Sequence, residues 1–529
     1  MRAVRGMDRG REPPQPPRPG APSNALVIVR PMPEIRFGTD GWRGVIAEAV
    51  TFDSVRLVAR AIARRVLAET AGAGAPQLLV GHDTRFLSRE FAQAAAEAMA
   101  AEGVRVHLAS DYAPTPAISY AVVRLGTAGA VVITASHNPP RYNGIKCKSS
   151  FGGSAPAAFT QGVEEEIRRI RAECRVPSAA AGNSAIRNPK SDIEEFDPRE
   201  PWLDRLESLV DLGAIGRGRI RIVLDAMYGA GQGLLAARLG RAGCAVRELH
   251  AEVNPAFGGL NPEPIPANLG ELTGCITAWG GPGPRVGFAF DGDADRVTPV
   301  DETGQVLSPH QTLALLLRHL ARNRGQRGPV VKSVNIGQLV DAEAGALGLP
   351  VVVTAVGFKH IAEAMRQGDA LLGGEESGGF AIRGHLPERD GALIALLLLE
   401  CMAGTGKSLG TLIRELEAEY GPHHYARLDL TLPTLAARDR VVAALTAAPP
   451  EQVGGVAVRG VVTMDGIKLV RSDRSWVMLR ASGTEPLLRI YAEAPSQAEV
   501  QALLAWGRGV ALARGIPDGA REFPGLNDR

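Results

Sequence analysis

The chain has 529 residues, too many for one hydrophobic core, and the usual domain size of about 100 to 200 residues predicts roughly three to five domains. Its 59 basic and 57 acidic side chains leave a formal net charge of +2, which argues against nucleic acid as a partner and favours a small-molecule ligand. The five cysteines show no metal-ligand spacing and the longest apolar run, 392–399, is too short to span a bilayer, so we expect a cytoplasmic protein with no structural zinc and no membrane segment.

The first part of the chain predicts a disordered tail followed by a domain of alternating helices and strands. We place this tail at 1–33; residues 1–24 are basic and proline-rich and have no apolar stretch, which is not typical of a signal peptide, and the translation start is expected at Met1, Met7 or Met32. Beyond this tail, a helix pattern at 54–68 and a short apolar strand at 77–81 begin the rhythm of a mostly parallel sheet.

Three further domains follow. A polar stretch without periodicity, 178–198, closes the first domain, which we place at 34–198. Two more segments repeat the helix and strand alternation, and the last has alternating strands and one final helix at 496–513, which indicates a smaller α+β domain. We place these domains at 199–308, 309–421 and 422–529.

The most informative loop of the first domain follows an apolar strand at 131–133. Asparagine, proline and glycine end that strand and present Ser136, His137 and Lys146 at what is expected to be its carboxyl end. Ligands collect at this edge of parallel sheets. On its own, however, a short Ser-His pair is more often a polar loop that caps a helix, so other loops must decide the interpretation.

The second domain carries a loop that predicts a magnesium site. Asp291, Asp293 and Asp295 alternate in DGDADR, so in extended backbone their carboxylates point to one side and offer hard oxygen ligands. A calcium loop is the rival interpretation, because Glu302 falls at its twelfth position. Arg296 stands where that loop needs glycine, however, and the flanking segments read as strands, so we favour Mg²⁺.

The third domain carries the glycine-rich loop 373–379. Its paired carboxylates, Glu375 and Glu376, and the hydroxyl of Ser377 can hydrogen-bond to neighbouring hydroxyls of a sugar. A tight turn with solvated acids explains the pattern equally well. This loop and the two before it share one design, which is weak support for an internal repeat whose loops face one cleft.

The fourth domain carries RASGTEPLLRI, which predicts an anion site between two strands. Ser482 and Thr484 supply hydroxyls, Gly483 frees backbone amides, and Arg480 and Arg489 supply guanidinium groups that match phosphate geometry. A plain hairpin turn is the alternative, which the flanking arginines disfavour.

Two other patterns resemble nucleotide sites. GTGKS at 404–408 lacks the first glycine of a P-loop, since Cys401 stands there, and the segment before it reads as a helix, so Ser408 is better explained as a helix cap. The glycines at 229 and 231 follow a strand as in a dinucleotide site, but the third glycine position is Leu234. An NAD site is therefore only weakly indicated.

Taken together, five motifs resemble the α-D-phosphohexomutase superfamily and occur in its order. They are FGTDGWRG at 37–44, TASHNPPRYNGIK at 134–146, DGDADR at 291–296, GGEESGG at 373–379 and RASGTEP at 480–486. The resemblance implies an α/β fold of four domains around a central cleft: three related domains with mixed, mostly parallel sheets and the smaller C-terminal one. It also implies an enzyme that moves a phosphoryl group between the 1- and 6-positions of a hexose phosphate.

The resemblance also implies roles for individual residues. Ser136 corresponds to the family's phosphoserine, and Ser136, Asp291, Asp293 and Asp295 to its Mg²⁺ ligands. Lys146 and Arg43 correspond to basic residues beside the reacting phosphate, and Arg296 is expected to contact that phosphate. The catalytic set is expected to be Ser136, Lys146, Arg43 and His385. The substrate-binding set is expected to be Arg296, Lys359, Glu375, Ser377, Arg389, Arg480, Ser482, Gly483, Thr484 and Arg489.

Three positions favour the phosphoglucomutase branch of the family. Gly379 stands where phosphomannomutases and phosphoglucosamine mutases often have histidine, His385 follows in GHLPERDG, and Glu376 replaces a common Met or Gln. This resemblance implies interconversion of glucose 1-phosphate and glucose 6-phosphate through glucose 1,6-bisphosphate. A phosphomannomutase or dual-specificity enzyme is the runner-up, ahead of a phosphoglucosamine mutase. From other classes, an NAD-dependent enzyme and a non-catalytic sugar-phosphate sensor stay open, as does the oligomeric state.

Overall fold

The computed structural model describes residues 34–70, 74–173, 192–281, 283–483 and 485–515, which contain four β-sheets. The predicted N-terminal tail and Thr484 lie outside these residues. Contacts between residues group the chain from Ile35 onward into one unit. The sequence predicted helix 54–68 and strand 77–81, and the structure has a helix at Phe52–Glu69 and a strand at Gln77–His82. The helix begins there because Thr51 caps it, accepting a hydrogen bond from the backbone of Ser54.

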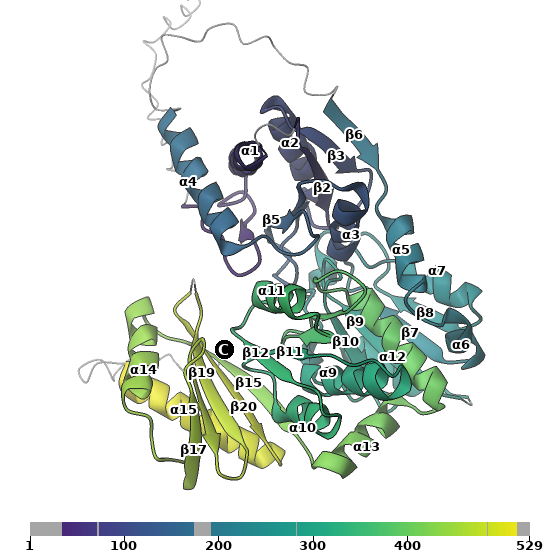
Figure 1. Cartoon of the computed structure of the whole chain (residues 1–529), viewed down its shortest axis with the longest axis vertical. Helices are drawn as coiled ribbons and strands as arrows, with labels where there is room; N and C mark the ends of the chain where they lie inside the picture. The colour runs from purple at the N-terminus through teal and green to yellow at the C-terminus, as the bar shows by residue number, and fades with distance from the viewer. Residues whose placement is uncertain (1–33, 71–73, 174–191, 282, 484, 516–529) are drawn as a thin grey trace, which may run out of the picture. The chain divides into compact units, whose positions relative to one another are not determined.

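The first sheet has six strands in the order β1-β5-β4-β2-β3-β6. Its strands β2, β3, β5 and β6 are labelled in Figure 1. Its four strands from β4 to β6 are parallel, whereas β5 and β1 run antiparallel to their neighbours. The strands are β1 (Trp42–Val45), β2 (Gln77–His82), β3 (Arg105–Ala109), β4 (Gly129–Ile133), β5 (Tyr142–Ser149) and β6 (Ile193–Phe196). The helices are α1 (Phe52–Glu69), α2 (Ser88–Ala101), α3 (Thr115–Leu125) and α4 (Ala157–Glu173).

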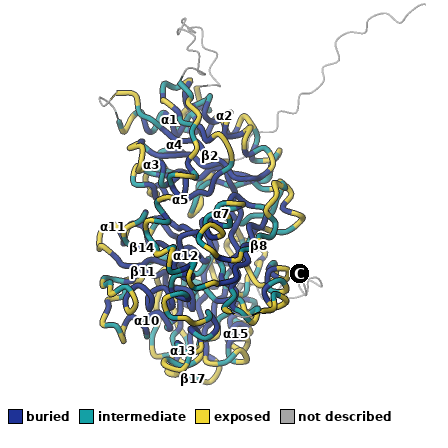
Figure 2. Tube along the Cα trace, turned by 90° about the vertical axis from the view of Figure 1, so that its right-hand side faces the viewer, coloured by how far each residue is buried: buried dark blue, intermediate teal, exposed yellow. Residues whose placement is uncertain are grey.

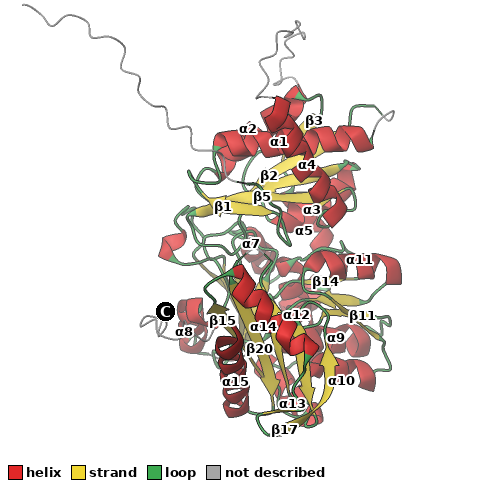
Figure 3. Ribbon diagram, turned by 90° about the vertical axis from the view of Figure 1, so that its left-hand side faces the viewer, coloured by secondary structure: helices red, strands yellow, loops and turns green. Residues whose placement is uncertain are grey.

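Helices cover both faces of this sheet, which is why its central strands are apolar throughout (Figure 3). On one face, Leu78 and Val80 of β2 join a buried cluster with side chains of α1, α2 and α4. On the other face, Leu79 packs with Ile118 and Val122 of α3. The side chains of a strand that is buried on both faces cannot contact a ligand. The polar groups that could do so therefore lie in the loops at the ends of the strands.

The second and third sheets repeat this design with four strands each. Their orders are β10-β9-β7-β8 and β12-β11-β13-β14, and only β10 and β14 are antiparallel to their neighbours. The second sheet has β7 (Arg221–Asp225), β8 (Ala245–Leu249), β9 (Arg285–Phe290), β10 (Val297–Val300), α5 (Arg199–Glu207), α6 (Leu212–Arg217), α7 (Leu234–Arg241) and α8 (Gly270–Ala278). The third has β11 (Val330–Ser333), β12 (Val351–Thr354), β13 (Leu372–Gly374), β14 (Phe380–Ile382), α9 (Pro309–Arg318), α10 (Gln338–Ala346), α11 (Phe358–Gly368), α12 (Gly391–Thr405) and α13 (Leu409–Tyr420).

The fourth sheet is antiparallel, in the order β15-β20-β19-β18-β17-β16. Side chains of its two helices form a buried cluster with one face of the sheet. Its elements are β15 (His424–Thr431), α14 (Leu435–Ala447), β16 (Gln452–Val453), β17 (Val456–Val462), β18 (Ile467–Arg471), β19 (Trp476–Ala481), β20 (Leu487–Ala494) and α15 (Gln497–Gly515). The predicted fold class is therefore confirmed: three mixed, mostly parallel sheets are followed by a C-terminal antiparallel one.

The apolar run 392–399 lies in α12 and is fully buried (Figure 2). Among the described residues, no single helix is long and apolar enough to cross a membrane; α12 and α13 pass such a test only as a pair, across an 80° bend. At that bend Gly406 ends α12 and Ser408 caps α13 by accepting a hydrogen bond from the Thr411 backbone. The interpretation of GTGKS as a helix end and a cap is confirmed.

Candidate functional site

Ser136 lies in the loop between β4 and β5, in a backbone conformation that non-glycine residues seldom adopt. Its φ is 53°, and its N–H donates to Oγ1 of Thr134 over 2.8 Å. The side chain is fully buried, and its Oγ donates to Oδ2 of Asp291 over 2.7 Å. A strained residue at a loop apex that reaches another domain is typical of a functional position.

One arginine that the sequence interpretation missed holds this loop in place. Arg85 donates from Nη2 to the carbonyls of Ser136 at 2.6 Å and Asn138 at 2.7 Å, and from Nη1 to those of Pro139 and Tyr142 at 3.0 Å. A signal was present, because Arg85 follows β2, the parallel neighbour of β4, and so lies at the same edge of the sheet.

The three aspartates of the second domain form the only described group with metal-ligand geometry. One oxygen from each lies within 4.8 Å of the others, and all three side chains are fully buried. Among the described residues, Oδ1 of Asp293 and Oδ1 of Asp295 have no hydrogen-bond partner. Burial, together with the charges of Asp295 and Asp293, raises the pKa of Asp291 to about 8. Buried carboxylates with unpaired oxygens suit a divalent cation such as Mg²⁺.

The metal loop and the serine loop approach each other because position 292 is glycine. A Cβ at Gly292 would lie 2.5 Å from the carbonyl oxygen of Ser136, which no side chain could occupy. Thr115, at the start of α3, donates to Oδ2 of Asp293 over 2.5 Å and so joins the first domain to the metal loop a second time. The flanking segments are strands, as expected, which disfavours a helix-flanked calcium loop.

Lys146, on β5, is surrounded by three carboxylates. Its Nζ lies 2.7 Å from Oδ2 of both Asp293 and Asp295, and 3.0 Å from Oδ2 of Asp40. Burial alone would lower the pKa of Lys146, but the attraction of the three carboxylates outweighs it and raises that pKa above its ordinary value. Lys146 therefore stays protonated here and supplies positive charge beside Ser136.

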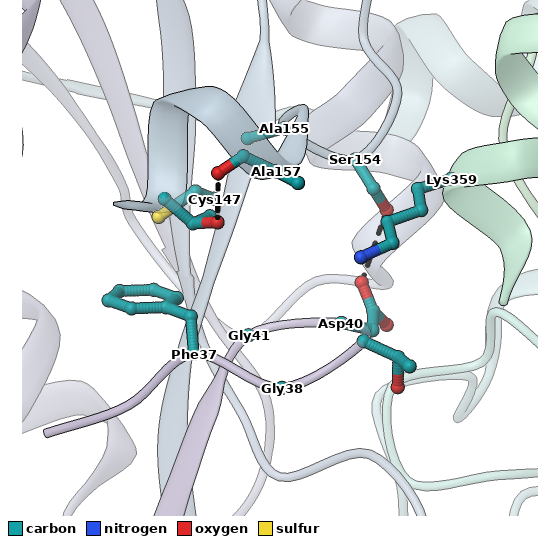
Figure 4. Close-up of a pocket in the computed structure, with 11 residues that line it drawn as sticks. Phe37, Gly38, Asp40, Gly41, Cys147, Ser154, Ala155, Ala157 and Lys359 are labelled. Atoms are coloured by element: carbon teal, nitrogen blue, oxygen red, sulfur yellow. Dashed lines mark hydrogen bonds between the residues drawn. The ribbon is translucent and has the colours of Figure 1, made fainter. Parts of the chain in front are cut away.

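Asp40 is a second residue to which the sequence interpretation gave no role, although it belongs to the FGTDGWRG motif. Its Oδ2 also pairs with Nη2 of Arg389, and its Oδ1 accepts a hydrogen bond from Ser154 at 3.1 Å. Burial would raise the pKa of Asp40, but Arg389 and Lys146 hold it well below its usual range. Lys359, from α11, faces the same small pocket as Asp40 (Figure 4).

The sugar loop, at 373–379, contacts the group of charged side chains around Ser136 (the Ser136 cluster) through Arg389. Its guanidinium lies 2.8 Å from Oδ2 of Asp295 and 3.3 Å from Oε1 of Glu375, which also accepts a hydrogen bond from Ser377 over 2.7 Å. A Cβ at Gly379 would lie 2.3 Å from Cδ of Arg389, so a side chain at this position would displace the arginine. The position of Arg389 in the site therefore depends on glycine at position 379.

Two further predicted cations lie at the edge of the cluster. Nε of Arg296 is 3.9 Å from Asp291 and 3.8 Å from Asp295. Arg43 donates to Oδ1 of Asn138 over 2.7 Å, in the serine loop. His137 is half-buried, and desolvation with the charge of Arg296 lowers its pKa well below the usual value, so it is neutral.

The catalytic role of His385 stays a prediction, and its contacts lie at the start of α12. Its Nε2 lies 3.0 Å from Oδ2 of Asp390, and its ring stacks on Tyr120. The same Asp390 oxygen accepts a hydrogen bond from Trp202, and the other oxygen caps α12. The described contacts thus tie His385 to the start of a core helix, and none joins it to Ser136.

The predicted phosphate loop of the fourth domain is held at its base. Arg480 donates from Nε to Oδ2 of Asp465 over 2.8 Å, and Nε of Arg489 is 3.9 Å from Asp429. Arg438 of α14, another residue that was missed, donates to the carbonyls of Ser482 and Glu485. The exposed Gly483 leaves the loop tip open. In the described residues, no hydrogen bond or ion pair joins this loop to the Ser136 cluster, whereas the other three loops meet there.

The glycine turn after β7 does not resemble an open dinucleotide site. A Cβ at Gly229 would lie 2.8 Å from the carbonyl oxygen of Gly292, which also accepts a hydrogen bond from Ala230 over 2.9 Å. Glu248 stands about where a dinucleotide site has its ribose-binding acid, but it accepts a hydrogen bond from the Gly233 backbone at 2.7 Å. The turn braces the metal loop, so the structure does not support the NAD alternative.

Comparison with known protein families matches four segments of the chain to known domains. Residues 34–173, 200–304 and 308–420 match Phosphoglucomutase/phosphomannomutase alpha/beta/alpha domains I, II and III, and residues 433–505 match the C-terminal domain. The chain is 32% identical over 471 residues to a phosphoglucomutase/phosphomannomutase of Thermococcus kodakarensis, covering 89% of this chain and 97% of that protein. It is also 32% identical over 477 residues to a phosphoglucosamine mutase of Alkalilimnicola ehrlichii, covering 88% and 94%.

Among solved structures, the chain is similar to one from Thermus thermophilus that is provisionally described as a phosphomannomutase. The two share 38% identity with a TM-score of 0.77, and the match covers 91% of this chain and 100% of that one.

Proposed function

The chain belongs to the phosphoglucomutase/phosphomannomutase family and is a phosphohexomutase, and we propose that it interconverts glucose 1-phosphate and glucose 6-phosphate through phosphorylated Ser136. The observation that carries the proposal is the 2.7 Å hydrogen bond from Oγ of Ser136 to Asp291. It joins the hydroxyl that would carry phosphate to the carboxylates that would hold the metal.

The proposed reaction has two balanced phosphoryl transfers. In the first, the 6-hydroxyl of glucose 1-phosphate attacks the phosphorus on Ser136. An O–P bond forms at the sugar as the serine O–P bond breaks, and the proton that the 6-hydroxyl loses is balanced by the proton that the freed Ser136 oxygen takes up. Glucose 1,6-bisphosphate then turns round, and its 1-phosphoryl group moves to Ser136 by the same chemistry in reverse. Glucose 6-phosphate is released, and Ser136 is phosphorylated again.

The chain's own cations suit such a transfer, which depends on position and charge more than on covalent help. Asp291, Asp293 and Asp295, with the phosphoserine oxygen, would hold Mg²⁺, which when bound neutralises charge on the phosphoryl group. A phosphoserine near −2, three carboxylates and one such cation leave about −3. Three side chains roughly balance that charge: Lys146, Arg43 and Arg296.

The sugar is proposed from the third loop. Glu375 and Ser377 are proposed to accept and donate hydrogen bonds to sugar hydroxyls in either orientation of the bisphosphate. Glycine at 379 supports the glucose branch, because the resemblance implies histidine at this position in the other branches, and here a Cβ would displace Arg389. Mannose 1-phosphate and glucosamine 1-phosphate are the alternatives, and the relative named as a phosphoglucosamine mutase keeps the second of them open. A cytoplasmic location and a hexose phosphate as the only partner remain predictions.

Rates on the three hexose 1-phosphates, with Mg²⁺ and glucose 1,6-bisphosphate present, test the proposal. We expect the highest kcat/KM on glucose 1-phosphate and no turnover by Ser136→Ala. A higher kcat/KM on mannose or glucosamine 1-phosphate would refute the glucose assignment alone. Tight binding of all three without turnover would instead indicate a sugar-phosphate sensor, and turnover that needs a nicotinamide would indicate a dehydrogenase.

A further inference from the structure

Glu376 belongs to the sugar loop, but its side chain contacts the fourth domain. Its Oε1 accepts a hydrogen bond from the hydroxyl of Tyr425 over 2.8 Å and lies 3.7 Å from Nη1 of Arg427. Both partners are on β15. Burial and the charge of Glu376 raise the pKa of Tyr425 well above its ordinary value, so the phenol keeps the proton that it donates. Glu376 therefore joins the two domains, and its neighbour Glu375 faces the Ser136 cluster.

Arg427 shares one face of the fourth sheet with the two arginines predicted to bind phosphate. The register pairs Arg427 with Tyr491, Asp429 with Arg489, and Arg489 with Arg480. Side chains paired directly across antiparallel strands lie on one face and within reach of each other. The three guanidinium groups therefore gather beside the loop that follows β19.

The charges of all three guanidinium groups act on the hydroxyl of Tyr491. Burial and Glu376 raise its pKa, and the charges of Arg489, Arg480 and Arg427 oppose that rise, so all three guanidinium groups act on one phenol. Arg427 and Arg489 are about one-third exposed, at 31% and 32%, so each can meet a ligand. Asp429 pairs with both arginines, and Glu376 pairs with Arg427. A phosphate dianion would compete with these carboxylates for the two partly exposed guanidinium groups.

We propose that Arg427 is a third phosphate-binding guanidinium of the fourth domain, and that Glu376 is the positioning residue that aims it from the sugar loop. The proposal rests on the proposed function, because it takes the phosphate that is not being transferred as the ligand. Glu376 would then act on phosphate binding and not on the sugar directly. The loop that recognises sugar hydroxyls and the arginines that hold the phosphate would be joined by one carboxylate.

Binding of glucose 6-phosphate to the Ser136→Ala background, measured by calorimetry, tests this. Arg427→Met keeps the aliphatic part of the side chain and removes its charge, and we expect it to raise Kd about tenfold, as loss of a charge-assisted hydrogen bond does. Inorganic phosphate should lose affinity by a similar factor. Arg459→Met, at an exposed arginine on β17, is the matched control and should leave both values unchanged.

A double-mutant cycle tests the positioning role of Glu376. Glu376→Gln should raise Kd severalfold in the normal protein but add little in Arg427→Met, because its effect passes through that arginine. Tyr425→Phe, which removes only the hydroxyl that Glu376 accepts from, should resemble a weaker Glu376→Gln. Thermal unfolding of each variant separates a loss of binding from a loss of folding.

The outcomes distinguish this inference from the proposed function. If Arg480→Ala weakens glucose 6-phosphate binding and Arg427→Met does not, Arg427 is only a structural partner of Asp429 and the inference is wrong. If Glu376→Gln adds its full effect to Arg427→Met, the positioning role is wrong. If the unaltered protein binds no hexose phosphate, the proposed function and this inference fail together.

Discussion

Asp291 gives a quantitative prediction about metal binding. In the metal-free protein its pKa is raised to about 8 by burial and by the charges of Asp295 and Asp293. At pH 7 a carboxyl group with that pKa is about 90% protonated, and at pH 9 about 10%. A bound cation stabilises the ionised form, so Mg²⁺ must displace this proton. We expect about 0.9 proton released per metal at pH 7 and about 0.1 at pH 9.

The sign of the effect follows from the direction of the shift. Because the raised pKa favours the protonated carboxyl group, metal binding is weakened below pH 8 and gains strength as the pH rises. The ionised fraction increases about tenfold between pH 7 and pH 9, so the apparent Mg²⁺ affinity should rise about tenfold over that range. Lys146 stays protonated throughout, since its pKa is raised, and contributes no proton.

Calorimetry in two buffers with different ionisation enthalpies, such as Tris and HEPES, measures the proton count. Ser136→Ala is the background, because phosphoserine itself titrates near pH 6 and would add a second proton. Asp291→Asn is the control and should release no proton while binding Mg²⁺ more weakly. Equal binding enthalpies in both buffers at pH 7, with an affinity that does not change with pH, would refute the reasoning about Asp291.

Three substitutions test the remaining parts of the site. Gly292→Ala places a methyl carbon 2.5 Å from the carbonyl of Ser136, and we expect it to lower kcat about 100-fold by displacing the reacting loop, as measured in a coupled assay. Asp40→Asn removes a half-buried charge 3.0 Å from Lys146 and should lower kcat about tenfold with a smaller change in KM. Arg480→Ala should raise KM about tenfold and leave kcat within a few fold, since Arg480 is proposed to bind only the phosphate that is not transferred.

Each of these variants has a matched control. Gly274→Ala, on α8, adds a methyl group to open space and should leave kcat unchanged. Asp53→Asn removes a carboxylate whose side chain is 85% exposed and should have no effect. Arg459→Met serves for Arg480→Ala. Normal kcat in Gly292→Ala, an unaltered rate in Asp40→Asn, or an unchanged KM in Arg480→Ala would each contradict the role given to that residue.

The fold and the contents of the loops were predictable because they depend on local patterns. Short apolar strands that end in glycine or hydroxyl residues predicted parallel sheets with their chemistry at the carboxyl edge. Alternation in DGDADR predicted three carboxylates on one side, and the structure brings them together. The fourth domain was predicted from alternating strands, which the antiparallel sheet confirms.

Contacts between side chains that are far apart in the sequence were not predictable in this way. Asp40 and Lys146 are far apart in the sequence, and no spacing rule indicates that they form an ion pair. Arg85 and Arg438 hold loops by donating to backbone carbonyls, and the only signal for this role was the position of Arg85 after β2, the neighbour of β4. For His385 a motif suggested chemistry, whereas its contact with Asp390, the residue that caps α12, could not be predicted from the sequence.

The central claim is that Ser136 carries the phosphoryl group. Dephosphorylated protein mixed with Mg²⁺ and glucose 1,6-bisphosphate bearing isotope-labelled phosphate can be quenched within one turnover and digested, and the label located by peptide mass spectrometry. We predict that the label is found on Ser136, disappears when glucose 1-phosphate is added, and is absent from Ser136→Ala. Label on a different residue, or full turnover by Ser136→Ala, would contradict the account.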